Sequence, residues 1–357
     1  MEELFLPLLS INFPSWLKPE IIPGLPVRWY GLMYIFAFAT AYLVYRVQVK
    51  ERNFPMTEDE LSSLFVWGII GLLLGARLFS TLIYETSDVY RRQPWLIFWP
   101  FRNGKFTGLQ GMSYHGGAFC GALAVFLFAK FKKFSFREIA DMFVAAIPLG
   151  YTFGRLGNFM NAELYGRATA MPWGMVFPNA KQLPTSYDWV REIAEKTGTE
   201  ITQNGGLSAM VNLPRHPSQL YEAFFEGIVL WALIWLFRNR KPFKGFLIGL
   251  YFLGYGVFRF FIEYFREPDS DLGYRIEFVK TTLHTAYAHP PFSFSTGQIL
   301  CFIMILLGLT WIIICSRLPN REPIRIYDGS ENAPPPVTKE DAAKDRNKRR
   351  KLRKKLK

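Results

Sequence analysis

The sequence predicts an all-α polytopic membrane protein with seven transmembrane helices, an outward-facing (extracytoplasmic) head region and an interfacial arm. Of its 357 residues, 50% are hydrophobic and 17% are aromatic, and these residues gather in long blocks. A helix needs about 20 mostly apolar residues to cross a bilayer. Seven stretches qualify: 29–47, 61–83, 114–131, 137–157, 219–237, 245–265 and 294–315.

These spans divide the chain into three parts. They are an outer N-terminal segment (1–28), a transmembrane domain (29–315) with an outer head region (158–218), and a basic, disordered cytoplasmic tail (316–357). Residues 1–28 contain acids and prolines but no basic segment before an apolar core, so we expect no cleavable signal. The cysteines fall within the predicted spans at Cys120, Cys301 and Cys315. They are too scattered for a metal site or disulfide framework, and we expect them to be packing residues.

Lysine and arginine residues set the predicted orientation. They concentrate after the first, third and fifth spans, at 46–52, 130–137 and 238–244, and such loops are typically cytoplasmic. The tail from Ser316 has fourteen Lys+Arg against six Asp+Glu, so 14 − 6 = +8 of the net charge of +13 lies there. Four basic residues between the second and third spans favour the opposite orientation but are outnumbered. The N-terminus is therefore predicted outside and the C-terminus inside.

Each predicted span carries polar residues at its outer end. They are Arg28 and Tyr30; Arg77; Ser113 and His115; Arg155 and Asn158; His216, Gln219, Glu222 and Glu226; Tyr255, Arg259 and Glu263; Ser295 and Gln298. One arginine near a helix end can simply extend to the headgroups, and Arg259 with Glu263 can be a structural i,i+4 pair. A charge near the bilayer centre costs on the order of 3 kcal/mol, however. The coincidence of all seven ends favours an outward-facing polar cavity.

The stretch GRLGNFMNAELYGR (154–167) has a composition suited to a phosphate. Arg155 and Asn158 lie one helical turn apart, and a guanidinium fork beside an amide suits a phosphate group. Arg77 and Arg259 are expected to meet the same anion from neighbouring spans. At membrane depth, and without a phosphate-binding P-loop, the expected anion is a phospholipid headgroup. The stretch PWLIFWPF (94–101) is too short to span and predicts an interfacial arm.

Six blocks carry a family resemblance: RWYGLMY (28–34), GMSYHGG (111–117), GRLGNFMNAELYG (154–166), RHPSQLYE (215–222), GYGVFRFFIEYFREPD (254–269) and STGQIL (295–300). In this order, over about residues 20–315, they closely resemble the bacterial prolipoprotein diacylglyceryl transferase family. The resemblance implies seven transmembrane helices in the bacterial inner membrane, a site open to the outer leaflet, and transfer of diacylglyceryl from phosphatidylglycerol to the lipobox cysteine of a prolipoprotein. It implies no metal and no cofactor.

The resemblance also implies residue roles. His115 matches the motif histidine and is the candidate general base, with a purely structural imidazole as the alternative. Arg155 and Arg259 match the essential arginines. Positions that match other motif residues, or are expected to contact the headgroup, are Tyr30, Arg77, Asn158, Glu163, Gly166, Tyr255 and Glu263, with Asn161 and Gln219 as supporting groups. Ala162 departs from the glycine of many relatives. A thiol of pKa about 8.5 is only a few per cent ionised at pH 7, so activation by a base or a positive field is required.

Other functions remain open at this point. A lipid transporter or flippase would also use an outer-leaflet headgroup cavity, although matching inverted halves with broken helices are not visible. A metal-dependent phosphatidyltransferase would need an aspartate-rich helix, and only Asp141 lies within a span. Ser113 near His115 imitates an intramembrane serine protease poorly, and a structural scaffold would need none of these residues. The polybasic tail is expected to bind anionic lipid rather than nucleic acid and to be dispensable.

Overall fold

The computed structural model describes residues 10–22, 28–86, 88–102, 104–106, 111–201, 209–267, 274–277, 284, 286–287 and 293–318. This part of the chain is mostly helical and divides into two compact units. The first unit holds the described residues up to Tyr45 and from Ala140 onward. The second runs from Arg46 to Ile139.

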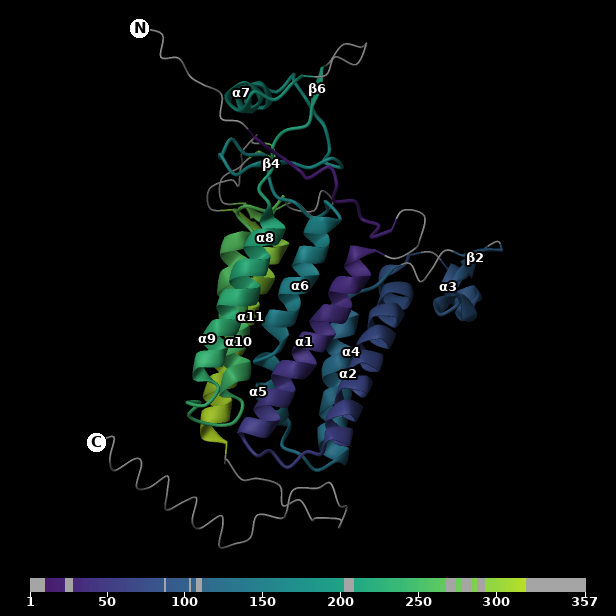
Figure 1. The fold of residues 1–357 in the computed structure, drawn as a ribbon, viewed down its shortest axis with the longest axis vertical. Coiled ribbons are helices and arrows are strands. Elements are labelled where there is room, and N and C mark those ends of the chain that lie inside the picture. The colour runs from purple at the N-terminus through teal and green to yellow at the C-terminus, as the bar shows by residue number, and fades with distance from the viewer. Residues whose placement is uncertain are drawn as a thin grey trace, which may run out of the picture. The chain divides into compact units, whose positions relative to one another are not determined.

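The second unit is built around two long helices that lie side by side, α2 (Glu58–Phe79) and α4 (Tyr114–Phe131) (Figure 1). A capping box between Thr57 and Glu60 satisfies the first turn of α2. The helix continues into a π-helical turn, η1 (Ser80–Tyr84). The arm follows, with α3 (Val89–Arg92), the 3₁₀ turn η2 (Pro94–Ile97) and the antiparallel pair β2 (Phe101–Arg102) and β3 (Lys105–Phe106).

Glycines allow α2 and α4 to approach closely. A Cβ atom added at Gly75 would collide with the carbonyl oxygen of Gly116 and the Cβ of Cys120, and one at Gly116 would collide with the carbonyl oxygen of Gly75. One turn away, a Cβ at Gly71 would lie 2.7 Å from that of Ala124. Small residues at this spacing let helix backbones touch inside a bilayer, where packing rather than hydrophobic burial drives helix association.

The first unit contains the other helices. They are the first part of α1 (Trp29–Glu51), most of α5 (Phe136–Val144), α6 (Ile147–Met160), α8 (Ser218–Glu222), the π-helix η3 (Ala223–Val229), α9 (Leu230–Phe237), α10 (Phe246–Ile262) and α11 (Thr296–Arg317). The pair α10 and α11 packs tightly, and a Cβ at Gly308 would lie 2.9 Å from the carbonyl oxygen of Gly249. Figure 1 shows α6, α8, α9, α10 and α11 running as a bundle.

The prediction of one continuous helix over 137–157 is wrong. The chain forms α5 up to Val144 and starts α6 at Ile147. Pro148 explains the break, because its ring would clash with the carbonyl group four residues earlier, which belongs to Val144. Asp141 on α5 is fully buried, and its carboxylate accepts hydrogen bonds from the backbone N–H groups of Gly245 (2.9 Å) and Leu247 (3.0 Å). It therefore caps the start of α10.

Small strands and one amphipathic helix form a head on this unit. β1 (Ile11–Asn12) pairs in parallel with β4 (Met175–Val176), and β5 (Leu183–Pro184) pairs antiparallel with β6 (Met210–Val211). Helix α7 (Asp188–Thr197) buries Val190 and Ile193 against these strands. β7 (Tyr274–Glu277) pairs with β8 (Ser293–Ser295), which leads into α11. In Figure 1, α7 and β6 lie beyond the ends of α6 and α8.

The chain is a polytopic membrane protein. In the described residues, five helices are long and apolar enough to cross a membrane: Trp29–Glu51, Glu58–Tyr84, Tyr114–Phe131, Ser218–Phe237 and Thr296–Arg317. These correspond to the spans predicted at 29–47, 61–83, 114–131, 219–237 and 294–315. The span predicted at 245–265 is the shorter apolar helix α10.

Candidate functional site

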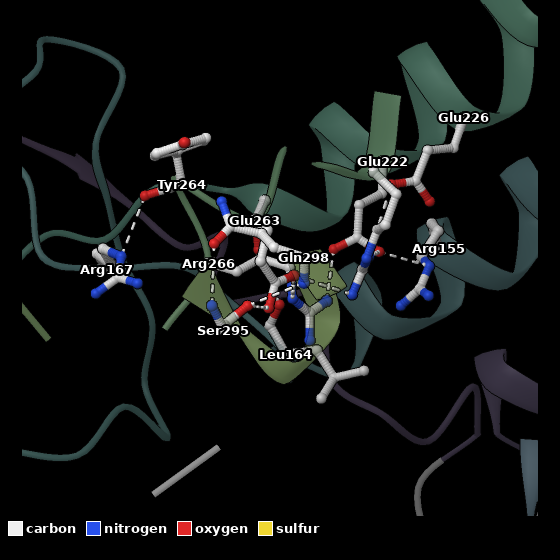
Figure 2. A network of polar contacts seen from close by, with 12 residues as sticks. Arg155, Leu164, Arg167, Glu222, Glu226, Glu263, Tyr264, Arg266, Ser295 and Gln298 are labelled. Atoms are coloured by element: carbon white, nitrogen blue, oxygen red, sulfur yellow. Dashed lines mark hydrogen bonds and ion pairs between the residues drawn. The ribbon is translucent and has the colours of Figure 1, made fainter. Parts of the chain in front are cut away.

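A buried carboxylate, Glu222 at the end of α8, is the centre of a polar network in the first unit. Its side chain is fully buried and contacts three guanidinium groups. One carboxylate oxygen lies 2.8 Å from Nε of Arg155 and 2.7 Å from Nη1 of Arg259, and the other lies 2.6 Å from Nη1 of Arg266. Figure 2 shows Glu222 between Arg155 and Arg266. One carboxylate thus gathers three cations from separate segments.

Glu226 enlarges the network one turn deeper. It is also fully buried, and its carboxylate accepts a hydrogen bond of 2.5 Å from the Tyr151 hydroxyl and lies 3.6 Å from Arg259. Tyr151 lies one turn before Arg155 on α6, and its hydroxyl oxygen accepts a hydrogen bond of 2.6 Å from Nε of Arg155. Because Glu222 and Glu226 are four residues apart, both face α6 and α10.

Glu263, at the end of α10, connects the network to α11. It lies 3.6 Å from both Arg259 and Arg266, and it accepts a hydrogen bond of 3.2 Å from the Ser295 hydroxyl. Ser295 also begins α11 through a capping box with Gln298. The i,i+4 pair considered between Arg259 and Glu263 is therefore present, within a larger network.

The network balances its charges but retains donors. Its three arginines and three glutamates sum to 3 − 3 = 0. Among the described residues, the hydrogen bonds of Arg155 are made by Nε and Nη1 and none by Nη2, whereas Nη1 of Arg259 is buried 2.7 Å from the Glu222 carboxylate without hydrogen-bond geometry. Free donors on positioned guanidinium groups can bind an additional anion, and bidentate phosphate binding is typical of arginine.

The end of α6 supports Arg155. Asn158 accepts a hydrogen bond of 3.4 Å from Arg155 and donates one of 2.9 Å to Glu163, which also accepts one of 3.3 Å from Asn161. The buried Gln219 donates a hydrogen bond of 2.6 Å to the carbonyl oxygen of Glu163. Four of the predicted site residues thus form one chain of contacts that ends at Arg155.

The backbone after α6 follows a constrained path. Ala162 has φ of 52° and Leu164 has φ of 57°, both in the left-handed region. This conformation explains why glycine suits position 162. The N–H of Gly166 donates a hydrogen bond of 2.8 Å to the carbonyl oxygen of His216. A side chain at position 166 would collide with the carbonyl oxygen of Phe265. The predicted glycine is therefore a close-approach point between the head and the end of α10.

Two predicted tyrosines lie beside this network. A Cβ added at Gly157 would lie 3.1 Å from the Tyr30 ring, so Tyr30 of α1 packs on the residue next to Asn158. Tyr255 on α10 packs edge-on against Tyr151, with ring centroids 6.0 Å apart. Both rings line the elements that carry the arginines.

His115 and Arg77 belong to the second unit. His115 is the second residue of α4, is exposed, and its Nδ1 atom lies 3.3 Å from the Tyr84 hydroxyl. Arg77 is 3% exposed and donates hydrogen bonds to the carbonyl oxygens of Ile97 (2.5 Å), Gly111 (3.2 Å) and Leu96 (3.3 Å). Arg77 thus fastens the arm to the end of α2, whereas we predicted that it contacts an anion.

Glu222 and Glu226 were counted among the polar residues of the predicted cavity but were given no role, and Arg266 and Tyr151 were absent from the predicted site. The depth of Glu226 within an apolar span was the available signal, because a buried acid needs a cationic partner. Among the described residues, no group of three or more His, Cys, Asp or Glu side chains has an arrangement that would hold a metal ion. The arrangement in the first unit is a network of three arginines and three glutamates at the ends of apolar helices.

The chain is similar to known proteins over most of its length. A family model described as prolipoprotein diacylglyceryl transferase matches residues 19–314. The chain is 54% identical to the phosphatidylglycerol–prolipoprotein diacylglyceryl transferase of Treponema denticola over 86% of this chain and 95% of the relative. It is 50% identical to that of Treponema pallidum, over 89% and 99%, and 40% identical to that of Chlorobaculum tepidum, over 84% and 90%.

Proposed function

The chain belongs to the prolipoprotein diacylglyceryl transferase family, and we propose that its arginine–glutamate network binds the phosphate of phosphatidylglycerol during transfer. The enzyme moves the diacylglyceryl group of phosphatidylglycerol onto the cysteine thiol of a prolipoprotein. The sulfur forms a bond to the glyceryl carbon that carried the phosphate, and the carbon–oxygen bond breaks. Its electron pair stays on the departing oxygen, which leaves as glycerol phosphate.

Arg155 and Arg259 are the proposed phosphate ligands. The leaving group gains negative charge as the carbon–oxygen bond breaks, and positioned cations stabilise such developing charge. Glu222 holds both guanidinium groups within 2.8 Å of one oxygen. A phosphate that binds their remaining donors therefore meets cations that are already positioned. This preorganisation is the observation that supports the proposal most directly.

His115 is the proposed general base. The cysteine thiol gives its proton to a ring nitrogen of His115, and the thiolate then attacks. Full ionisation of a thiol with pKa about 8.5 is worth roughly 2 kcal/mol at pH 7. The exposure of the imidazole is consistent with access by a peptide thiol. The proton ends on the imidazole, so the charge of the departing glycerol phosphate is balanced.

The remaining candidates contact the substrate or support the arginines. We propose headgroup contacts for Tyr30, Tyr255 and Glu263, support of Arg155 by Asn158 and Glu163, and backbone shape from Gly166. Asn161 and Gln219 hold Glu163. We propose seven spans, counting α5 with α6 as one, an extracytoplasmic N-terminus, and residence in the bacterial inner membrane. In this proposed orientation, the network at the ends of the apolar helices lies on the side of the outer leaflet.

The test is a reconstituted transfer reaction. Purified protein is incubated with phosphatidylglycerol and a lipobox peptide, and the diacylglyceryl adduct is sought by mass spectrometry. We expect an adduct from the wild type and none from folded Arg155→Ala or Arg259→Ala. Arg191→Ala is the matched control, because this arginine lies exposed on α7 and pairs only with Asp188 among the described residues.

Two further results discriminate between the alternatives. His115→Gln should lose transfer while retaining binding of phosphatidylglycerol, and transfer at the wild-type rate would reject the base assignment alone. Lipid scrambling by the wild type without any adduct would instead identify a flippase.

A further inference from the structure

The end of α2 has an unusual shape. Instead of stopping at Phe79, the helix continues as the π-helical turn η1, whose last residue is Tyr84. A π-helical turn is wider than an α-helical turn, it changes where the following side chains point, and it occurs frequently at functional sites. Here the turn carries the Tyr84 hydroxyl to within 3.3 Å of Nδ1 of His115.

The backbone that carries His115 is fixed against this same helix. The N–H of Ser113 donates a hydrogen bond of 2.8 Å to the carbonyl oxygen of Ala76, and the Ser113 side chain caps α4 by accepting from the N–H of Gly116 (3.2 Å). Gly116 then presses against Gly75 so closely that it has no room for a Cβ. Tyr84 and His115 therefore extend from two helices whose backbones are held together at this end.

The contact bears on which ring nitrogen is free, because the Tyr84 hydroxyl can either donate to Nδ1 or accept from it, depending on the tautomer. A neutral imidazole carries one proton, and only its other nitrogen can accept another. If Nδ1 carries the proton, it donates to the Tyr84 oxygen, and Nε2 is available to receive the thiol proton. Without an acceptor at Nδ1, this tautomer loses its hydrogen bond. Partners of the second nitrogen commonly fix the tautomer of a working histidine.

We propose that Tyr84 is a positioning residue that orients His115 and holds its proton on Nδ1, so that Nε2 acts as the base. This inference rests on the proposed base role of His115. The Tyr84 oxygen also stabilises the imidazolium that forms when the thiol proton arrives, because a charged donor makes a stronger hydrogen bond than a neutral one. The benefit is thus larger after proton transfer than before it.

The variant Tyr84→Phe keeps the ring and removes the hydroxyl. We expect kcat to fall about 10-fold with KM unchanged, since a hydrogen bond to a group that becomes charged is worth about that factor in rate. Tyr114→Phe is the matched control, because the Tyr114 ring packs edge-on against the imidazole at 5.8 Å while the Tyr84 hydroxyl is the group bonded to Nδ1. It should retain wild-type kcat.

Nitrogen NMR gives a readout that packing alone would not change. The chain has 4 histidines, so ¹⁵N-histidine labelling in detergent gives few signals, and His115→Gln assigns the signal of His115. The wild type and Tyr114→Phe should show a protonated Nδ1 and an unprotonated Nε2, and Tyr84→Phe should move the His115 shifts toward a tautomer mixture. A protonated Nε2 in the wild type, or identical spectra and kcat in Tyr84→Phe, would overturn the proposal.

The two levels of inference fail separately. If His115→Gln transfers at the wild-type rate, the base assignment is rejected, and the positioning role falls with it. If His115→Gln is inactive but Tyr84→Phe matches the wild type in kcat and in NMR shifts, only the role of Tyr84 is rejected.

Discussion

Replacing Glu222 by glutamine should destabilise the protein more than any single surface change. The substitution keeps the side-chain shape but removes the one negative charge that lies within 2.8 Å of three guanidinium groups. Two unit charges about 4 Å apart attract by about 4 kcal/mol at an effective dielectric constant of 20. The three attractions are offset by the cost of burying the carboxylate, which the wild type bears and the variant does not.

The net effect is smaller than that sum. Removing one partner of a buried ion pair typically costs 3–5 kcal/mol, because the remaining charges stay buried without compensation. We therefore expect Glu222→Gln to lose about 4 kcal/mol of unfolding free energy. Glu192→Gln is the control, since its exposed i,i+4 pair with Lys196 should contribute less than about 0.5 kcal/mol.

Thermal unfolding in detergent, followed by intrinsic fluorescence, measures both variants. Glu222→Gln should also gain more stability than the wild type when glycerol phosphate is added, because its arginines carry an excess positive charge and ligand binding stabilises the folded state by mass action. If Glu222→Gln unfolded at the same temperature as the control variant, the carboxylate would not be holding the arginines. If glycerol phosphate protected neither protein, the network would not be a phosphate site.

Three other predictions concern packing, capping and pH. Gly75→Ala should prevent correct packing of α2 on α4 and cost several kcal/mol in the same assay, whereas Gly68→Ala should be tolerated, since its added Cβ would meet the nearest side chain at an ordinary 3.7 Å. Asp141→Asn should lose about 3 kcal/mol, because it removes the buried partner of Lys241 (2.9 Å). Burial, and to a lesser extent the positive charge of Arg167, lower the pKa of His216 from 6.5 to about 4. As the pH falls, the unfolded chain therefore takes up a proton on His216 at a higher pH than the folded protein does. The free energy of unfolding should be constant above pH 6.5 and fall by about 3 kcal/mol toward pH 4. His216→Asn should lack this component in a pH series of unfolding midpoints, and an unchanged pH dependence would refute it.

The sequence predicted the long apolar helices well because length and hydropathy alone decide them. Five predicted spans have counterparts in described helices that are long enough to cross a membrane. The failure at 137–157 came from counting apolar residues without weighing Pro148, whose effect on the backbone is local and independent of hydropathy. The predicted seven-span count and orientation remain predictions, as do the boundaries of the tail beyond residue 318.

Site residues could be predicted where a residue is unusual for its own position in the sequence. Arg155, Asn158 and Glu163 lie within one short polar stretch, and Asn158 does contact both of the others. Glu222 gave a weaker signal, because a glutamate at a helix end usually lies in solvent. Only the fold shows that α6, α10 and the segment after α10 all direct an arginine at it. The role of Arg77 was similarly hidden, since its partners are backbone carbonyl groups of the arm.

The neutrality of the network has a consequence for the reaction. Three guanidinium groups brought together without carboxylates would repel one another, so Glu222, Glu226 and Glu263 make it possible to collect them near a lipid surface. A phosphate that enters adds charge to a balanced site and must compete with these carboxylates for donors. In the proposed role we therefore expect moderate lipid binding, while the extra charge that develops on the leaving phosphate meets arginines that are already positioned. Interactions that strengthen only as the bond breaks accelerate the chemical step, whereas uniform tight binding does not.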